Sequence, residues 1–281
     1  MRYFRLAAFL LLVVLSTLPA TCASARADVV TDLYFAQTVV TGTVEPERTR
    51  GMREALTEVA IKLTGDPRLA GSPRLAALLE KPADLVQRFE YEDRMKDLPV
   101  RDEQGTRERP HFLRVWFEPA KTERALRGLK LRLWSPNRPV VHVFLALRTG
   151  KGLSWLAREG DDGALQRLVL IEAARRRGLP VGLPSIESAR RLATLVSDPS
   201  PKVGMAAIAA ATAAPTGASH ALIGELRTRP DGYWQTWWSL RFPRRSGKSA
   251  VSIASADGVT FDRALKEAID GTVQILSGHR P

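Results

Sequence analysis

The chain has 281 residues, with 42 Lys and Arg against 30 Asp and Glu, and a single cysteine. A chain of this length can bury enough apolar surface to fold without disulfides, and one cysteine excludes any disulfide within the chain. It also excludes a metal site built from several thiolates.

Residues 1–27 have the pattern of a cleavable signal peptide. Two arginines precede an almost unbroken apolar run over residues 6–18, and small residues follow, ending at Ala27. The run is shorter than the about 20 residues that a membrane-spanning helix needs. We therefore expect cleavage after Ala27, export to the bacterial periplasm, and no transmembrane segment in the mature chain. Cys22 leaves open a lipoprotein signal, although Thr21 is a poor match to the residue before a lipidated cysteine.

The mature chain predicts two α/β units joined by a linker. The first unit spans residues 28–133, the linker 134–139 and the second unit 140–281. The linker contains two prolines, and the hydrophobic periodicity of the flanking segments stops there.

In the first unit, the expected order is a strand, two helices, two strands and a helix. Their ranges are residues 33–44, 47–63, 74–79, 85–91, 112–117 and 120–129. The first helix is the clearest, because its apolar residues recur three or four positions apart and Gly65 follows as a stop signal. This order predicts helices packed on one face of an antiparallel sheet.

The second unit begins with a continuous apolar run over residues 140–147, typical of a strand buried on both faces. Strands are also expected over 179–183, 221–227, 233–242 and 250–255, and helices over 164–177, 186–195, 202–214 and 261–276. The predicted fold class is α+β: two α/β sandwich units, each a mostly antiparallel sheet packed by helices.

Four stretches of the chain resemble a known family. They are REAL to KLTG (residues 53–65), LW to RP (133–139), RGLP to LP (177–184), and G to DGYW and WSL (224–240). Together they resemble an uncharacterised bacterial envelope family catalogued as a domain of unknown function (number twenty sixty-six). Residues 198–201 depart from the family pattern. The resemblance implies export and one family over nearly the whole mature chain, but it implies no activity.

The element order of the second unit also resembles two envelope adaptor modules at the level of the fold. These are the amino-terminal domain of the Tol-Pal β-propeller protein and the periplasmic domains of curli secretion lipoproteins. A shared fold does not fix a function.

No motif for catalysis or cofactor binding stands out. The four histidines, His111, His142, His220 and His279, lie far apart in the sequence and form no zinc pattern. A nucleophile elbow, a phosphate-binding loop and a dinucleotide fingerprint are also missing. We therefore expect no catalytic residue, no metal and no cofactor. The alternative is a periplasmic hydrolase whose site assembles from distant histidines and acidic residues of the 84–103 region.

The strand over residues 233–242 is rich in aromatic side chains. Alternation places Trp234 and Trp238 toward the core and places Tyr233, Trp237 and Arg241 on the opposite face. Tyr, Trp and Arg are the residue types of interface hot spots. We expect a binding surface there, and the alternative is that a helix or the first unit covers this face as ordinary core.

Basic residues concentrate in the middle of the chain, where residues 121–191 hold 15 basic and 6 acidic side chains. Arg175, Arg176 and Arg177 end one predicted helix, and Arg167 lies on the same helix. These four form a candidate anion-binding site, and the alternative is that they complement the helix dipole. Arg138, in the linker, is expected to join the two units by donating to backbone carbonyls.

The function expected from the sequence is a non-catalytic periplasmic binding or envelope-assembly module acting through an aromatic and basic surface. Its expected partner is an envelope protein, a glycan or an anionic lipid surface, and not nucleic acid. A binder of anionic lipid or lipopolysaccharide that uses the basic middle remains a further alternative.

Overall fold

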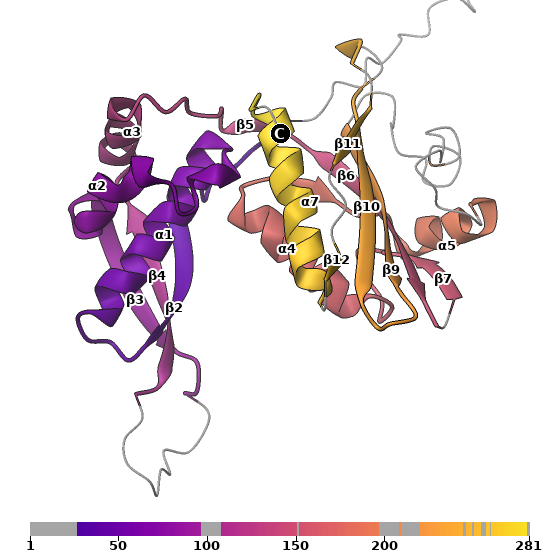
Figure 1. The fold of residues 1–281 in the computed structure, drawn as a ribbon, viewed down its shortest axis with the longest axis horizontal. Coiled ribbons are helices and arrows are strands. Elements are labelled where there is room, and N and C mark those ends of the chain that lie inside the picture. Colours follow the sequence, from indigo (N-terminus) through magenta and orange to yellow (C-terminus); the bar gives the residue numbers. More distant parts are fainter. Residues whose placement is uncertain are drawn as a thin grey trace, which may run out of the picture.

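The computed structural model describes residues 27–96, 108–150, 152–196, 208, 220–243, 246–248, 250–253, 257–258 and 260–279. The expected signal peptide and nearly all of the helix expected over 202–214 lie outside these residues. The described part contains two larger sheets, each with its own helices, and a two-stranded sheet (Figure 1). The expected α+β class is confirmed. None of the described helices is long and apolar enough to cross a membrane.

The first sheet is antiparallel, in the order β2 (Phe35–Thr41), β4 (Pro110–Phe117) and β3 (Val86–Asp93). Helix α1 (Glu47–Thr64) packs along one face of this sheet. The helix lies close to β2, because a Cβ added at Gly51 would stand 2.6 Å from Val40 Cγ1. Only a residue without a side chain allows this approach.

The first unit also contains several shorter helices. They are η1 (Pro67–Leu69), η2 (Pro73–Leu75), α2 (Ala76–Glu80), η3 (Pro82–Leu85) and α3 (Pro119–Gly128). Helix α1 ends where Gly65 adopts a left-handed conformation, with φ of 72°. The buried apolar side chains of this part form one cluster between Leu33 and Leu131.

The second sheet has seven strands. The main path is β11 (Val251–Ile253), β10 (Trp234–Arg241), β9 (His220–Thr228), β6 (Val141–Thr149) and β7 (Gly152–Trp155), while β12 (Asp257–Gly258) pairs with β10 and β8 (Val181–Gly182) with β6. The pairings of β6 with β9 and with β8 are parallel, and the others are antiparallel. The sheet is thus mostly antiparallel, as expected.

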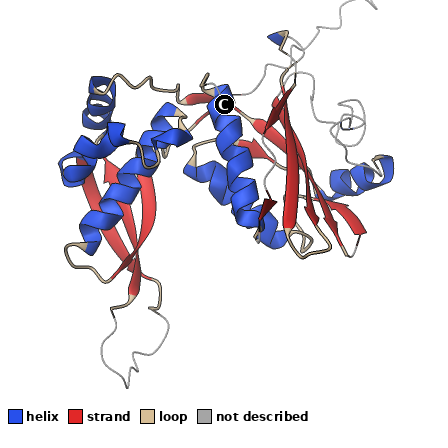
Figure 2. Ribbon diagram, viewed as in Figure 1, coloured by secondary structure: helices blue, strands red, loops and turns tan. Residues whose placement is uncertain are grey.

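Helices cover both faces of the second sheet (Figure 2). Helices α4 (Ala164–Arg176) and α7 (Phe261–Leu276) lie on one face, and α5 (Ile186–Leu195) lies on the other. Strand β6 supplies both cores: Val143 and Leu145 point toward α4 and α7, whereas Phe144 and Ala146 point toward α5. Burial on both faces was predicted from its continuous apolar run.

The two units meet at the linker, where β1 (Ala27–Val29) pairs antiparallel with β5 (Asn137–Pro139). Arg138 is fully buried there. Its guanidinium donates to the backbone oxygens of Lys62 (2.6 Å), Arg177 (2.9 Å) and Gly178 (2.8 Å). Arg138 therefore joins the first and second units through carbonyl groups, as expected from the sequence.

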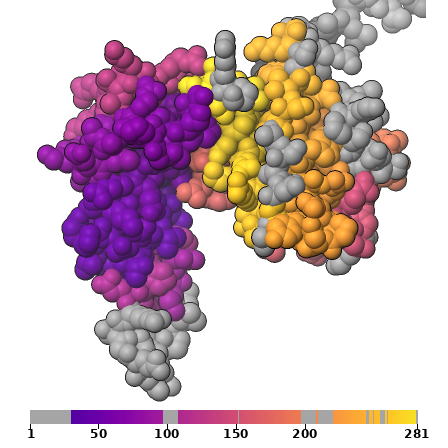
Figure 3. All heavy atoms as spheres, in the orientation of Figure 1, coloured from indigo at the N-terminus to yellow at the C-terminus, as the bar shows by residue number. Residues whose placement is uncertain are grey.

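The C-terminal end of α7 adds a second contact between the units (Figure 3). Ser277 Oγ donates to the backbone oxygen of Gly65 at 3.0 Å. His279 Nε2 lies 3.1 Å from the backbone oxygen of Thr64. The end of α1 is thereby held by the last residues of the described chain.

Candidate functional site

The aromatic strand expected to form a binding surface is largely packed inside the second unit. Trp238 and Leu240 are buried in the cluster beneath α4 and α7, as alternation predicted. On the opposite face, Trp237 is half-buried against the cluster that includes α5, and its Nε1 donates to Glu225 Oε2 at 3.0 Å. Arg241 is also half-buried.

Tyr233 precedes β10 and is exposed. The structure therefore places Tyr233, Trp237 and Arg241 in different surroundings, and Trp237 follows the alternative of ordinary core packing. Whether these three residues bind a partner stays a prediction.

The four arginines of the candidate anion site are engaged within the protein. Arg167 donates to the backbone oxygens of Ala157 and Gly160. Arg175 pairs with Glu172 of its own helix.

The next two arginines hold neighbouring elements in place. Arg176 pairs with the buried Glu58 of α1, at 2.6 Å from Nε to Oε2. Arg177 is nearly buried and pairs with Asp270 of α7 at 2.6 Å. These contacts favour a structural role for the arginines, the alternative to anion binding.

Aromatic and charged side chains gather on the face of the first sheet that lies opposite α1. Alternation along β2, β4 and β3 directs nine side chains outward, and all of them are half-buried or exposed. We call this surface the outer sheet face. Its three cross-strand rows are Phe35, Trp116 and Arg88; Gln37, Arg114 and Glu90; and Val39, Phe112 and Glu92.

The first row of the outer sheet face is a stack of rings and a cation. The Phe35 and Trp116 rings lie 5.0 Å apart between centroids, and the Arg88 guanidinium lies 3.4 Å from the centroid of the Trp116 ring. Such a cation over an indole is attracted by the negative face of the ring. The stack is therefore ordered in the free protein.

The other two rows place charges beside apolar side chains. Arg114 donates from Nε to Gln37 Oε1 at 3.2 Å and forms an ion pair with Glu92. Arg94 lies over the Phe112 ring, 4.9 Å from its centroid. Flat rings and guanidinium groups held in fixed positions suit contact with another macromolecule, since little side-chain entropy is lost on binding.

The sequence contains a signal for this surface in the strand over residues 112–117. In residues 112–117, Phe112, Arg114 and Trp116 alternate with Leu113 and Val115. Strand periodicity alone would have placed the first three on one face. These side chains stay at the surface because α1 covers only the other face of the sheet, and the local sequence does not specify which face a helix covers.

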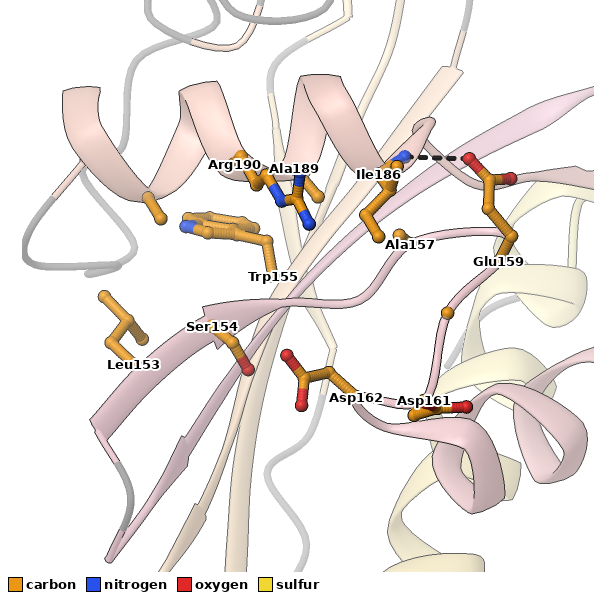
Figure 4. A pocket seen from close by; sticks show the side chains of 12 residues that line it. Leu153, Ser154, Trp155, Ala157, Glu159, Asp161, Asp162, Ile186, Ala189 and Arg190 are labelled. Carbon is orange, nitrogen blue, oxygen red and sulfur yellow. Dashed lines mark hydrogen bonds between the residues drawn. The ribbon is translucent and has the colours of Figure 1, made fainter.

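A cavity of about 390 Å³ lies in the second unit between β7, the start of α5 and the loop that joins β7 to α4 (Figure 4). Asp162 and Arg190 extend into it from different walls, and Ser154 lies beside Asp162. Trp155 is 4 % exposed, and its Nε1 has no hydrogen-bond partner among the residues that the structure describes. The walls thus contain a cation, a carboxylate and an indole N–H that is not engaged by any described residue. Such groups are able to hold a small polar molecule.

Glu159, at the edge of this cavity, stabilises the start of α5. Its carboxylate accepts the backbone N–H of Ile186 at 2.9 Å and pairs with Arg158. The Ile186 N–H and the Arg158 guanidinium lower the pKa of Glu159. The residue therefore fixes the first turn of α5 as a charged carboxylate.

The histidines are not brought together. His111 Nδ1 lies 2.8 Å from the backbone oxygen of Arg109, and His279 Nδ1 lies 3.9 Å from Asp66 Oδ2. Burial lowers the pKa of His142 and of His220, which favours the neutral ring in both. Within the described ranges, no group of three or more His, Cys, Asp and Glu could hold a metal ion.

The comparison with known proteins found a family model that matches the first unit. No curated protein matches the chain. The resemblance of the second unit to envelope adaptor modules, and the family number expected from the sequence, stay predictions. Residues 27–135 match a family model described as Domain of unknown function (DUF8605), and the outer sheet face lies inside this matched region.

Proposed function

We propose that the protein is a non-catalytic binding or assembly module of the bacterial cell envelope. It holds a protein partner through the outer sheet face. The observation that carries this proposal is the set of ordered aromatic and guanidinium groups on a sheet face opposite the packed helix. The exported location follows from the leader pattern of residues 1–27.

The composition of the face favours a protein partner over a lipid surface. Arg114 is already paired with Glu92, and Arg88 with Glu90, so the cations are largely neutralised. A membrane binder depends on unpaired basic residues near the anionic surface. Half-buried aromatic residues flanked by paired charges resemble the centre and rim of a protein interface.

Photo-crosslinking in living cells tests the proposal. Val39 lies in the third row and is 42 % exposed, so a photoreactive residue there faces the partner. Leu195 of α5 is 55 % exposed and provides the matched control position. We expect a defined protein adduct from position 39 and none of the same mass from position 195.

Two substitutions test whether that adduct depends on the outer sheet face. Trp116→Ala removes the central ring, and truncation of a hot-spot residue costs at least about 2 kcal/mol, or roughly thirtyfold in affinity. Arg114→Glu reverses a charge and leaves the rings in place. Both should deplete the adduct without lowering the amount of folded protein. An adduct that persists in both variants, or one made only of lipid or glycan, would contradict a protein partner at this face.

A further inference from the structure

Helix α4 exposes more apolar surface than a helix on the outside of a protein normally does. Leu170 and Ala174 are buried against the second sheet, which accounts for one side of the helix. On the other side, Leu165 is 66 % exposed, Leu168 is 64 % exposed and Ile171 is 44 % exposed. A helix that is apolar on all sides is expected to be buried on all sides.

A groove runs beside Leu168. It has a volume of about 450 Å³ and lies between α4 and α7. Its apolar part includes Leu168, Val169 and Ala173, while Asp262 and Lys266 line it from α7. A branched apolar side chain from outside could enter this groove.

Opposite charges mark the two ends of the same helix. Asp161 and Asp162 precede its first turn, and no ion pair engages either of them in the part of the chain that the structure describes. Arg175 and Arg176 stand in its last turn. Arg175 pairs with Glu172 and with Asp32 in partly exposed contacts, which contribute little stability and can be exchanged.

The positions along α4 are balanced about Leu168. Leu165 and Ile171 each lie three residues from it on the helix; Arg175 lies seven residues after it, and Asp161 lies in the segment just before the helix begins. When two copies of a helix pack antiparallel, residues equally far from the twofold axis face each other. An axis at Leu168 would bring Leu165 of each copy against Ile171 of the other and Asp161 against Arg175.

We infer that the exposed face of α4 binds a second copy of this chain, with the two α4 helices antiparallel about a twofold axis at Leu168. The acidic start of each helix then lies against the basic end of the other, and Leu165 of each copy packs against Ile171 of the other. The inference rests on charge complementarity and exposure in the second unit, and it does not depend on the outer sheet face.

The oligomeric state of the purified full chain is the first test, measured by sedimentation equilibrium over a range of concentrations. The wild-type chain should form dimers. Leu168→Asp should weaken them by about a hundredfold or more, because two charges would meet on the axis. Leu195→Asp, which changes a similarly exposed leucine on α5, should leave the dimer unchanged. A wild-type chain that is monomeric at every concentration overturns the inference.

Charge reversal separates self-association from binding of an unrelated apolar partner. Asp161→Arg alone and Arg175→Asp alone should each weaken the dimer, since each creates like charges across the axis. The double variant exchanges the two charges within one chain and should restore the affinity toward the wild-type value. Failure of the double variant to recover, with folding intact, would contradict the antiparallel arrangement.

A disulfide tests the position of the axis. The chain has one cysteine, so Cys22→Ser gives a background free of thiols. Two helices packed about 10 Å apart bring facing Cα atoms to roughly 5 Å, within the range that a disulfide spans. Leu168→Cys in this background should form covalent dimers under mild oxidation, and Leu195→Cys should not. Equal yields from both positions would indicate random collision.

Discussion

Gly224 in β9 marks a close contact between the second sheet and its aromatic core. A Cβ added at this position would lie 2.3 Å from the Trp238 ring and 2.7 Å from the backbone oxygen of Trp237. Neither neighbour can retreat easily, since Trp238 is buried and the oxygen belongs to the adjacent strand. The absence of a side chain at Gly224 therefore allows β9 and β10 to pack as they do.

We expect Gly224→Ala to lower the free energy of unfolding by about 1–3 kcal/mol, the usual cost of overpacking a core. Urea titration followed by tryptophan fluorescence measures the change. Gly128→Ala at the end of α3 is the matched control, because an added Cβ there meets nothing within 4 Å. That control should leave the stability unchanged or raise it. Equal effects of the two variants would show that packing against Trp238 is not the cause.

Two tryptophans show what the sequence could and could not reveal about a site. Trp237 and Trp116 both alternate with core residues along a strand, so periodicity assigns each to an outward face. Trp237 is nevertheless packed against the cluster of α5, whereas Trp116 lies on a face opposite the packed helix. Which face of a sheet receives a helix is decided by the chain's path in three dimensions, and strand periodicity carries no information about it.

At the level of elements, helices with strong local signals were predicted closely. Helix α7 matches its predicted range of 261–276, and α5 matches 186–195. Helix α1 was expected over 47–63 and ends one residue later. Capping residues, a glycine stop and apolar spacing are all local, so one stretch of sequence is enough to identify them.

The elements that the sequence did not predict are short strands. Strand β7 follows a glycine-rich turn and has only four residues, while β1 and β5 have three each. Strands this short bury too little to leave a periodic pattern. They form because β6 and the linker present unpaired backbone groups to them.

Two strands of the second sheet carry histidines that respond to pH. Burial lowers the pKa of His142 in β6, and burial together with Lys248 lowers that of His220 in β9. The unfolded chain therefore binds more protons than the folded protein once the pH falls below about 6.5. The stabilising effect of the neutral rings is complete above that pH and is lost progressively below it.

We accordingly expect the free energy of unfolding to fall as the pH is lowered from 7.5 to 5.5, measured by urea titration in matched buffers. His142→Gln with His220→Gln should make this decline shallower, because neither replacement titrates. A steeper decline in the double variant would contradict the assignment to these two rings.

At the scale of the whole molecule, one guanidinium connects two separate cores. Arg138 donates to carbonyls of α1 on one side and of the residues after α4 on the other. It also lies over the Trp134 ring, 4.0 Å from its centroid. Burial lowers the pKa of Arg138 to about 10, which still leaves the side chain charged at neutral pH.

Arg138→Met should lower the free energy of unfolding by about 3 kcal/mol or more, because several buried carbonyl groups lose their donor at about 1–3 kcal/mol each. Calorimetry measures this and also shows whether the two units then unfold in separate transitions. Arg124→Met, at an exposed position of α3, should change the stability by less than about 0.5 kcal/mol. Equal losses in the two variants would argue against a joining role for Arg138.

The pairing of β1 with β5 bears on the order of events during maturation. Ala27, after which we expect the leader to be cut, is the first residue of β1 and pairs with Pro139. A peptidase needs an extended, unpaired backbone around the bond that it cleaves. Cleavage at this bond would therefore come before the strand joins the linker, and it would leave Asp28 and Val29, without Ala27, to pair with Arg138 and Asn137.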